Sequence, residues 1–180
     1  MAVVEIVRRK AAIAGFVTDA ITGLAISNAV VKITAKNLER EAGPDGFFYF
    51  PDLRAGTYTL TVSAPVLGSR YGVVKITGVS VQNAVDGRPI FNTKASVRLP
   101  PTRVSGTVTR SSDGQPLVKA VVRVLGGEAK CLTDQNGKYV LTGLYAGTPT
   151  VQASAADRAT SAKKVTLAAG QETVADFSLA

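Results

Sequence analysis

The sequence predicts an all-β protein made of two tandem antiparallel β-sandwiches. Three observations support this prediction: many β-branched residues, an internal repeat, and turn residues spaced about ten positions apart. Of the 180 residues, 49 are Val, Ile or Thr. β-branched side chains lose rotamer freedom in a helix and pack well on a pleated surface, so their excess favours strands.

An internal repeat covers most of the chain. Residues 13–62 align without gaps with residues 104–153, at an offset of 91, and 13 of these 50 positions are identical. Several identities fall on turn glycines, such as Gly46 with Gly137. Two copies of one series of short strands and turns predict two sandwiches rather than a helical repeat.

Each half is expected to contain the same strands. Apolar residues alternate along them, and glycines fall between them, where tight turns need a positive φ. The positions expected to face the two cores are Val17, Val31, Ile33, Phe48, Phe50, Leu60 and Val62 in the first half, and Val108, Val122, Val124, Tyr139, Leu141 and Val151 in the second.

The boundary between the halves is marked by two prolines. Pro100 and Pro101 cannot donate ladder hydrogen bonds, and together they form a short, stiff connector. We therefore expect an N-terminal sandwich at 1–99 and a C-terminal sandwich at 102–180. Sandwiches of this size can hold a core without disulfides. The single Cys excludes an intrachain disulfide.

The turn and core residues of the first half follow one pattern. It reads Gly-x-Val-x-Asp-x-x-Thr-Gly from Gly15, Ala-x-Val-x-Ile from Ala29, and Asp-Gly-Phe-x-x-Phe-x-x-Leu-x-x-Gly-x-Tyr-x-Leu-x-Val from Asp45. This pattern resembles the carboxypeptidase regulatory-like domain, and the resemblance covers nearly all of the chain, twice. It implies an Ig-like (prealbumin-like) fold. It also implies an accessory module without catalytic residues, of the kind attached to peptidases, surface proteins, outer-membrane receptors and phage-like particles.

Catalysis is not expected from the residues themselves. The chain has no His, which excludes Ser-His-Asp and Cys-His arrangements and His-ligated zinc. Acidic residues such as Asp45 and Asp134 stand where turns favour a short side chain that accepts bonds from the backbone. No loop has the dense Asp and Asn pattern of a calcium site. We therefore expect no enzyme activity, no cofactor and no metal.

The net charge of +8 raises nucleic acid or an anionic surface as partners. The basic residues are scattered, however, and only Arg8-Arg9-Lys10 form a run. Aromatics are not interleaved with them as on a single-strand-binding surface. Nucleic acid is therefore not the expected partner, and the charge is interpreted as an aid to solubility.

The sequence gives no sign of membrane insertion, because no apolar run is long enough to cross a bilayer. The first residues are not interpreted as an export signal. Asp19 interrupts their apolar stretch, and the segment is the first strand of the repeat. Synthesis and first use in the cytoplasm are expected, with an extracellular location only if the chain is a fragment.

Four successive aromatics follow Gly46 in the first half, whereas the second half has Lys, Tyr, Val and Leu after Gly137. Because side chains alternate across a strand, Phe47 and Tyr49 are expected on the face opposite the core. Aromatics on an outer sheet face indicate a contact surface. The alternative is that the long loop of the same domain covers them.

That loop, at 83–93, accounts for the greater length of the first half, which is 11 residues longer there than the second. Loops at the ends of sandwiches often carry recognition. We predict partner contacts from Asn83, Asp86, Arg88 and Phe91, with Arg88 and Phe91 as the anchors. The alternative is a longer hairpin without a function of its own.

An N-terminal arm precedes the repeat and has no counterpart in the second half. It is strand-like around Val4 and Ile6, so we predict that it pairs either with a sheet of its own domain or with the sheet edge of a neighbouring subunit. Deleting residues 1–10 should then change assembly more than fold.

Cys131 aligns with Arg40, which indicates an edge or solvent-facing strand position. A lone Cys at such a position most often serves as a small apolar residue.

Taken together, these features predict a non-catalytic structural protein whose two rigid modules contact other subunits of a larger assembly. A phage-like tail, baseplate or contractile injection particle is one concrete form. A carbohydrate-binding or cell-surface adhesion module is one alternative, which the absence of Trp disfavours. An accessory domain of a separate enzyme is another.

Overall fold

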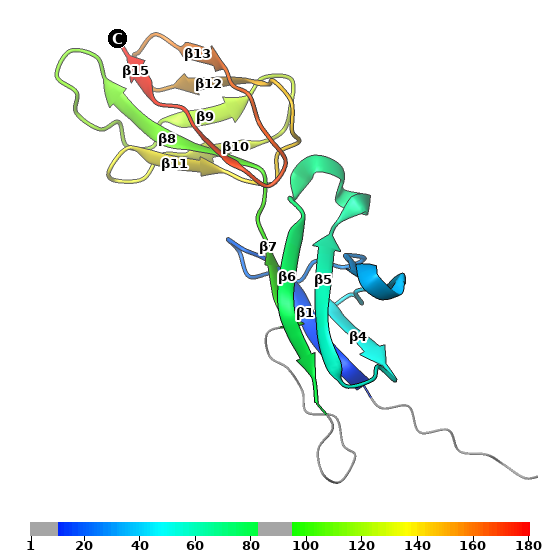
Figure 1. The fold of residues 1–180 in the computed structure, drawn as a ribbon. Coiled ribbons are helices and arrows are strands. Elements are labelled where there is room, and N and C mark those ends of the chain that lie inside the picture. The colour runs from blue at the N-terminus through cyan, green and yellow to red at the C-terminus, as the bar shows by residue number, and fades with distance from the viewer. Residues whose placement is uncertain (1–10, 83–94) are drawn as a thin grey trace, which may run out of the picture. The chain divides into compact units, whose positions relative to one another are not determined.

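The computed structural model describes residues 11–82 and 95–180 and consists mainly of short strands (Figure 1). The first half contains β1 (Ala11–Asp19), β2 (Val30–Ile33), the 3-10 helix η1 (Thr34–Lys36), β3 (Leu38–Glu41), β4 (Phe47–Pro51), β5 (Gly56–Ser63), the 3-10 helix η2 (Pro65–Arg70), β6 (Val74–Val81) and β7 (Val97–Leu99). The second half contains β8 (Arg103–Arg110), β9 (Val121–Val124), β10 (Lys130–Leu132), β11 (Lys138–Leu141), β12 (Thr150–Ser154), β13 (Ser161–Lys164), β14 (Glu172–Val174) and β15 (Phe177–Leu179). The all-β prediction is confirmed.

The chain divides into two compact units. The first unit contains the described residues up to Val66 together with those of Val73–Leu99, and the second contains Leu67–Gly72 and Pro100–Ala180. The segment Leu67–Gly72 is thus grouped with the second unit, although the predicted boundary places it in the N-terminal sandwich. Within either unit, no helix of the described residues is long and apolar enough to cross a membrane.

Each unit is a sandwich of two sheets. In the first unit the strand orders are β4-β1-β7 and β3-β2-β5-β6. In the second they are β11-β8-β14, with β15 also pairing with β8, and β10-β9-β12-β13. The predicted sandwiches are confirmed, with one difference. The last strands β7, β14 and β15 run parallel to β1 or β8, because they reach the sheet by a crossover rather than through a hairpin.

The sequence repeat is also a repeat of hydrogen bonds. The amide of Val17 donates to the Gly46 carbonyl at 2.8 Å, and 91 residues later the amide of Val108 donates to the Gly137 carbonyl at 2.8 Å. Other backbone bonds repeat at the same offset. The bond from the Ile26 amide to the Val17 carbonyl corresponds to that from Leu117 to Val108, and the bond from Ala42 to Ala29 corresponds to that from Thr133 to Ala120. The bond from the Gly43 amide to the Phe47 carbonyl corresponds to that from Asp134 to Lys138. The two halves therefore share their backbone register as well as their sequence pattern.

The inward positions predicted from the alternation lie in the two cores. All are buried except Val124, which is half-buried against the second core. The first core also includes Val79 and Leu99, and the second includes Phe177 and Leu179. Burial of these side chains supplies most of the driving force that holds each pair of sheets together.

Candidate functional site

Three aromatic side chains form an exposed row on the outer face of the sheet β4-β1-β7. Phe47 and Tyr49 come from β4, and Phe16 comes from β1, where it lies directly opposite Phe47 in the antiparallel register. The exposed fractions are 46% for Phe16, 37% for Phe47 and 49% for Tyr49. The neighbouring residues on β4, Phe48 and Phe50, face the core.

The rings of this aromatic row touch one another. The centroids of Phe16 and Phe47 are 5.3 Å apart, with the rings tilted by 56°. Phe47 and Tyr49 are stacked, at 6.2 Å between centroids and 24° between planes. The row is therefore one continuous apolar surface rather than three separate side chains, and it spans the edge strand β4 and the central strand β1.

A shallow hollow of about 320 Å³ lies beside the aromatic row. It is lined by Arg40, Glu41, Gly43, Asp45, Phe47, Phe48 and Tyr49. The Arg40 guanidinium carbon also lies 6.0 Å from the centre of the Phe50 ring. The site thus combines an apolar surface with charges of both signs at its rim, an arrangement that suits a partner offering both apolar and polar groups.

The second unit lacks this surface. The positions 91 residues later hold Thr107, Lys138 and Val140, and β11 pairs with β8 in the equivalent register, with Lys138 opposite Thr107. A shared backbone therefore carries an aromatic row in one unit and mixed, mostly polar side chains in the other. Packing of the fold does not require the aromatics, because the second unit folds in the same way without them.

The residues matched by a family model correspond to these two units. The carboxypeptidase regulatory-like domain matches residues 12–86 and again residues 103–180. The chain belongs to the carboxypeptidase regulatory-like domain family. The resemblance found in the turn and core residues is thereby confirmed.

Solved structures similar to this pair of regulatory-like domains have low sequence identity. The TIE protein of Bacillus anthracis is 15% identical, with a TM-score of 0.41 over 95% of this chain and 34% of that protein. A Streptococcal ancillary pilin is 12% identical, with a TM-score of 0.34 over 92% of this chain and 61% of the pilin. The shaft pilin SpaA of Lactobacillus rhamnosus GG is 12% identical, with a TM-score of 0.36 over 96% of this chain and 98% of the pilin. The chain spans less than two thirds of the first two proteins, and no curated protein matches it.

The structure places the predicted site residues as follows. Phe47 and Tyr49 lie on the outer face of the first regulatory-like domain, as the alternation predicts. Phe16 was not predicted as part of the site. Its position could have been predicted, because Val17 was assigned inward and its neighbour on the strand, Phe16, must then face outward. The predicted contacts Asn83, Asp86, Arg88, Phe91, Val4 and Ile6 lie outside the described residues and stay predictions.

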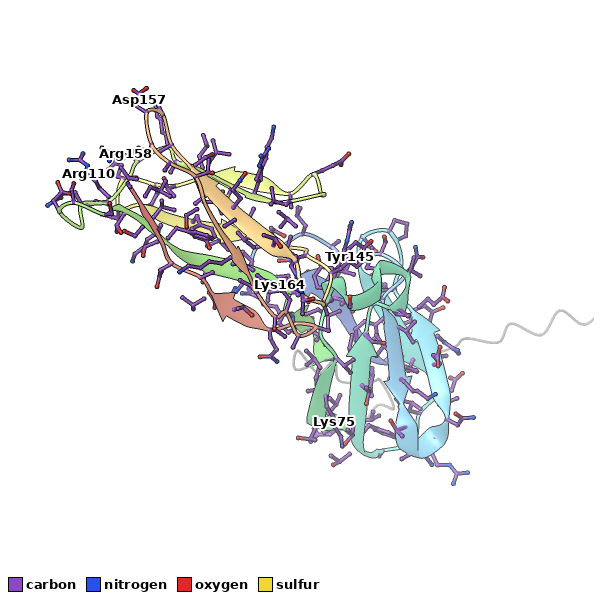
Figure 2. The ribbon with its side chains drawn as sticks, turned by 90° about the horizontal axis from the view of Figure 1, so that it is seen from above. Lys75, Arg110, Tyr145, Asp157, Arg158 and Lys164 are labelled. Carbon is purple, nitrogen blue, oxygen red and sulfur yellow. The ribbon has the colours of Figure 1, made fainter. Side chains whose placement is uncertain are left out.

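A second hollow, of about 370 Å³, lies in the second unit. Its lining residues are Arg70, Val124, Gly127, Glu128, Ala129, Gly143, Leu144, Tyr145 and Pro149. Tyr145, labelled in Figure 2, belongs to the connection between β11 and β12. The Arg70 guanidinium carbon lies 4.6 Å from the centre of its ring, which is a cation–π contact.

Burial affects two titratable side chains of the second regulatory-like domain. Cys131 is half-buried on β10, and burial raises the pKa of its thiol; a thiol of this kind is a poor nucleophile. Burial also raises the pKa of Tyr139, whose hydroxyl donates to the Ala175 carbonyl at 2.5 Å. Among residues 11–82 and 95–180, no three His, Cys, Asp or Glu side chains gather closely enough to hold a metal ion.

Proposed function

We propose that this chain is a non-catalytic structural protein whose first unit contacts a protein partner through the aromatic row Phe16, Phe47 and Tyr49. The row is the observation that carries the proposal, because it is exposed, continuous and confined to one copy of a repeated fold. Exposed apolar patches with charged residues at the rim are typical of protein interaction sites. A subunit of a phage-like tail, baseplate or injection particle is one concrete form of the proposal.

The geometry supports a protein partner because the apolar surface and the charges adjoin. Burying three aromatic side chains supplies a large apolar contribution to binding. Arg40, Glu41 and Asp45 line the adjoining hollow and can pair with polar groups at the edge of a partner. Such an arrangement places an aromatic anchor at the centre of a contact and polar groups around it, as in many protein interfaces.

The repeat itself supplies the variant that tests this proposal. Replacing Phe16 by Thr, Phe47 by Lys and Tyr49 by Val gives the first unit the residues that the second unit carries at the same positions. The unchanged protein and the F16T/F47K/Y49V variant are used to capture binding proteins from the native source, and the proteins are quantified by mass spectrometry. We expect at least one protein to be enriched roughly tenfold by the unchanged chain, equivalent to about 1.4 kcal/mol of binding free energy.

The matched control is Val140→Ala, which removes apolar surface from the same strand position in the second unit. Both variants should retain folded spectra, since the altered side chains are exposed. If the F16T/F47K/Y49V variant recovers the same proteins in the same amounts as the unchanged chain, the aromatic row is not the contact surface.

Carbohydrate binding is the second candidate, because the two stacked rings of Phe47 and Tyr49 present faces on which a sugar ring can lie. A glycan array separates the candidates. Saturable binding of a glycan by the unchanged chain, lost in the F16T/F47K/Y49V variant but kept in Val140→Ala, would favour this second function over a protein partner.

A further inference from the structure

The hollow in the second unit has a filled counterpart in the first. Its lining comes from the β9–β10 turn, from the β11–β12 connection and from Arg70, and all of these residues belong to the second unit. Pro149, which directly precedes β12, forms part of the lining. The position 91 residues earlier is Tyr58, whose side chain is only 8% exposed.

Tyr58 closes the equivalent corner of the first unit. It lies on the same face of β5 as Leu60 and Val62, which are buried. Its hydroxyl donates to the carbonyl oxygen of Arg54 at 2.8 Å. A buried tyrosine whose hydroxyl bonds to the backbone contributes both apolar burial and a satisfied polar group. The first unit thus completes its core at this end with a ring of its own.

The strands at the two corners pair in the same register, although the turn between β2 and β3 contains a 3-10 helix and the turn between β9 and β10 does not. Ile33 pairs with Leu38 and with Leu60 in the first unit. In the second unit Val124 accordingly pairs with Val151, and its amide donates to the carbonyl of Ala129, the position 91 residues after Leu38. The following loop also repeats its positive φ angles, 57° at Asp52 and 67° at Gly143, and 156° at Gly56 and 145° at Gly147.

Two lining positions carry a smaller residue in the second unit: Pro149 where the first has Tyr58, and Ala129 where it has Leu38. The strands share their register, so these smaller side chains leave space at the corner where the hollow of about 370 Å³ lies. The hollow therefore lies at a corner where the first unit carries the buried ring of Tyr58.

We propose that this hollow receives a tyrosyl side chain from a partner polypeptide. Val124, Ala129 and Leu144 offer apolar contacts to the ring. The backbone carbonyl of Tyr145 is the counterpart of that of Arg54, which accepts the Tyr58 hydroxyl in the first unit, and it is the acceptor that we assign to the incoming hydroxyl. The planar guanidinium of Arg70, which lies over the Tyr145 ring, also lines the hollow and offers a cation–π contact to the entering ring. This inference goes beyond the proposed function and rests on residues of the other unit.

The test is titration of the full ¹⁵N-labelled chain, followed by amide chemical shifts. The probes are 4-methylphenol, which is the tyrosine side chain itself, and the capped peptides Gly-Tyr-Gly, Gly-Phe-Gly and Gly-Leu-Gly. We expect saturable shifts for 4-methylphenol and Gly-Tyr-Gly, with dissociation constants on the order of 1 mM, as for small fragments. The shifts should centre on the lining amides of Gly127, Ala129, Leu144 and Tyr145. Gly-Phe-Gly should bind several-fold more weakly, because it lacks the hydroxyl, and Gly-Leu-Gly should not saturate.

Two variants fill the hollow with the first unit's own residues. In Pro149→Tyr and in Ala129→Leu, binding of 4-methylphenol should weaken at least tenfold. Ala162→Leu, which adds the same side chain at an exposed position on β13, should bind as the unchanged chain does. Each variant is checked by the dispersion of its amide spectrum, and either filled variant that folds is sufficient for the comparison.

Three results would overturn the proposal. The first is the absence of saturable shifts at the lining amides. The second is undiminished binding of 4-methylphenol by both filled variants. The third is binding of free 4-methylphenol without binding of Gly-Tyr-Gly, which would show that the hollow cannot admit a side chain attached to a polypeptide. None of these results bears on the aromatic row of the first unit, so the two proposals stand or fail separately.

Discussion

Gly106 lies so close to Ala175 that no side chain fits between them. A Cβ atom placed on Gly106 would overlap the carbonyl oxygen of Ala175 and stand 2.7 Å from its carbonyl carbon. In the first unit, Gly15 has the same relation to Ala95, with 2.7 Å from its Cβ position to the carbonyl carbon. The cause is the last strand of each sandwich, which passes tightly against the first and then pairs with it in parallel.

Substituting Gly106 by Ala should therefore destabilise the second unit strongly. Relieving the overlap requires the backbone at Ala175 to move, and we expect a cost of about 3 kcal/mol, at the upper end of typical overpacking. Guanidinium denaturation measures the change. Gly127→Ala is the matched control, since its Cβ position has no neighbour closer than 3.7 Å. Equal stability of the two variants would show that the close approach is not a constraint.

Thr102 connects two segments inside the second unit and is fully buried. Its hydroxyl donates to the Ser69 carbonyl at 2.7 Å and accepts a bond from the Gly170 amide at 2.7 Å. Thr102→Val keeps the shape but removes both bonds, so we expect a loss of about 2 kcal/mol of unfolding free energy. The same substitution at exposed Thr142 is the control and should cost little. Hydrogen exchange of the Gly170 amide, faster in Thr102→Val only, locates the effect.

Lys119 adopts a left-handed conformation, with φ 57°, and its counterpart Asn28 has φ 55°. Asn tolerates this region better than Lys, because its short side chain can bond to the local backbone. Lys119→Asn should therefore stabilise the second unit by about 0.5 to 1 kcal/mol. Lys138→Asn, on strand β11, is the opposite case and should be neutral or destabilising. Thermal denaturation of both variants checks the prediction, which fails if Lys119→Asn lowers the melting temperature.

Asp176 links the end of the second unit to β8 and makes its stability depend on pH. Hydrogen bonds from the Thr107 amide and hydroxyl, at 2.7 and 2.8 Å, hold the pKa of Asp176 below its ordinary value of 3.8. A carboxylate with a lowered native pKa contributes stability that is complete above its unfolded pKa. This contribution is lost as the pH falls from about 4 through the native pKa.

The measurement compares unfolding free energies at neutral pH and near pH 3. Asp176→Asn should show a smaller loss between the two than the unchanged chain, because one titrating group is removed. Some loss should persist, since hydrogen bonds from Ser105 and Arg103 also lower the pKa of Glu172. Asp157→Asn, which removes a carboxylate from an exposed turn, is the matched control, and its acid loss should exceed that of Asp176→Asn. An identical acid loss in Asp176→Asn and the unchanged chain would contradict the prediction.

Local pattern was sufficient to predict the strands, the turns and the two cores. Alternation places Phe48 and Phe50 inside and Phe47 and Tyr49 outside, because side chains on a strand alternate between its faces. The partner of these aromatics across the sheet, Phe16, was not predicted. The register between β1 and β4 decides which β1 residue lies opposite Phe47. Strand pairing is a non-local property that alternation within one strand does not specify.

The sequence by itself determined the family, the repeat and its register, because β-branched residues, turn glycines and alternating apolar positions act over a few residues at a time. Tertiary structure alone decided three features: the parallel last strands, the inclusion of Leu67–Gly72 in the second unit, and the two hollows. These features arise where segments distant in sequence pack together. The space that a missing ring leaves at Pro149 becomes visible only when the surrounding backbone is in place.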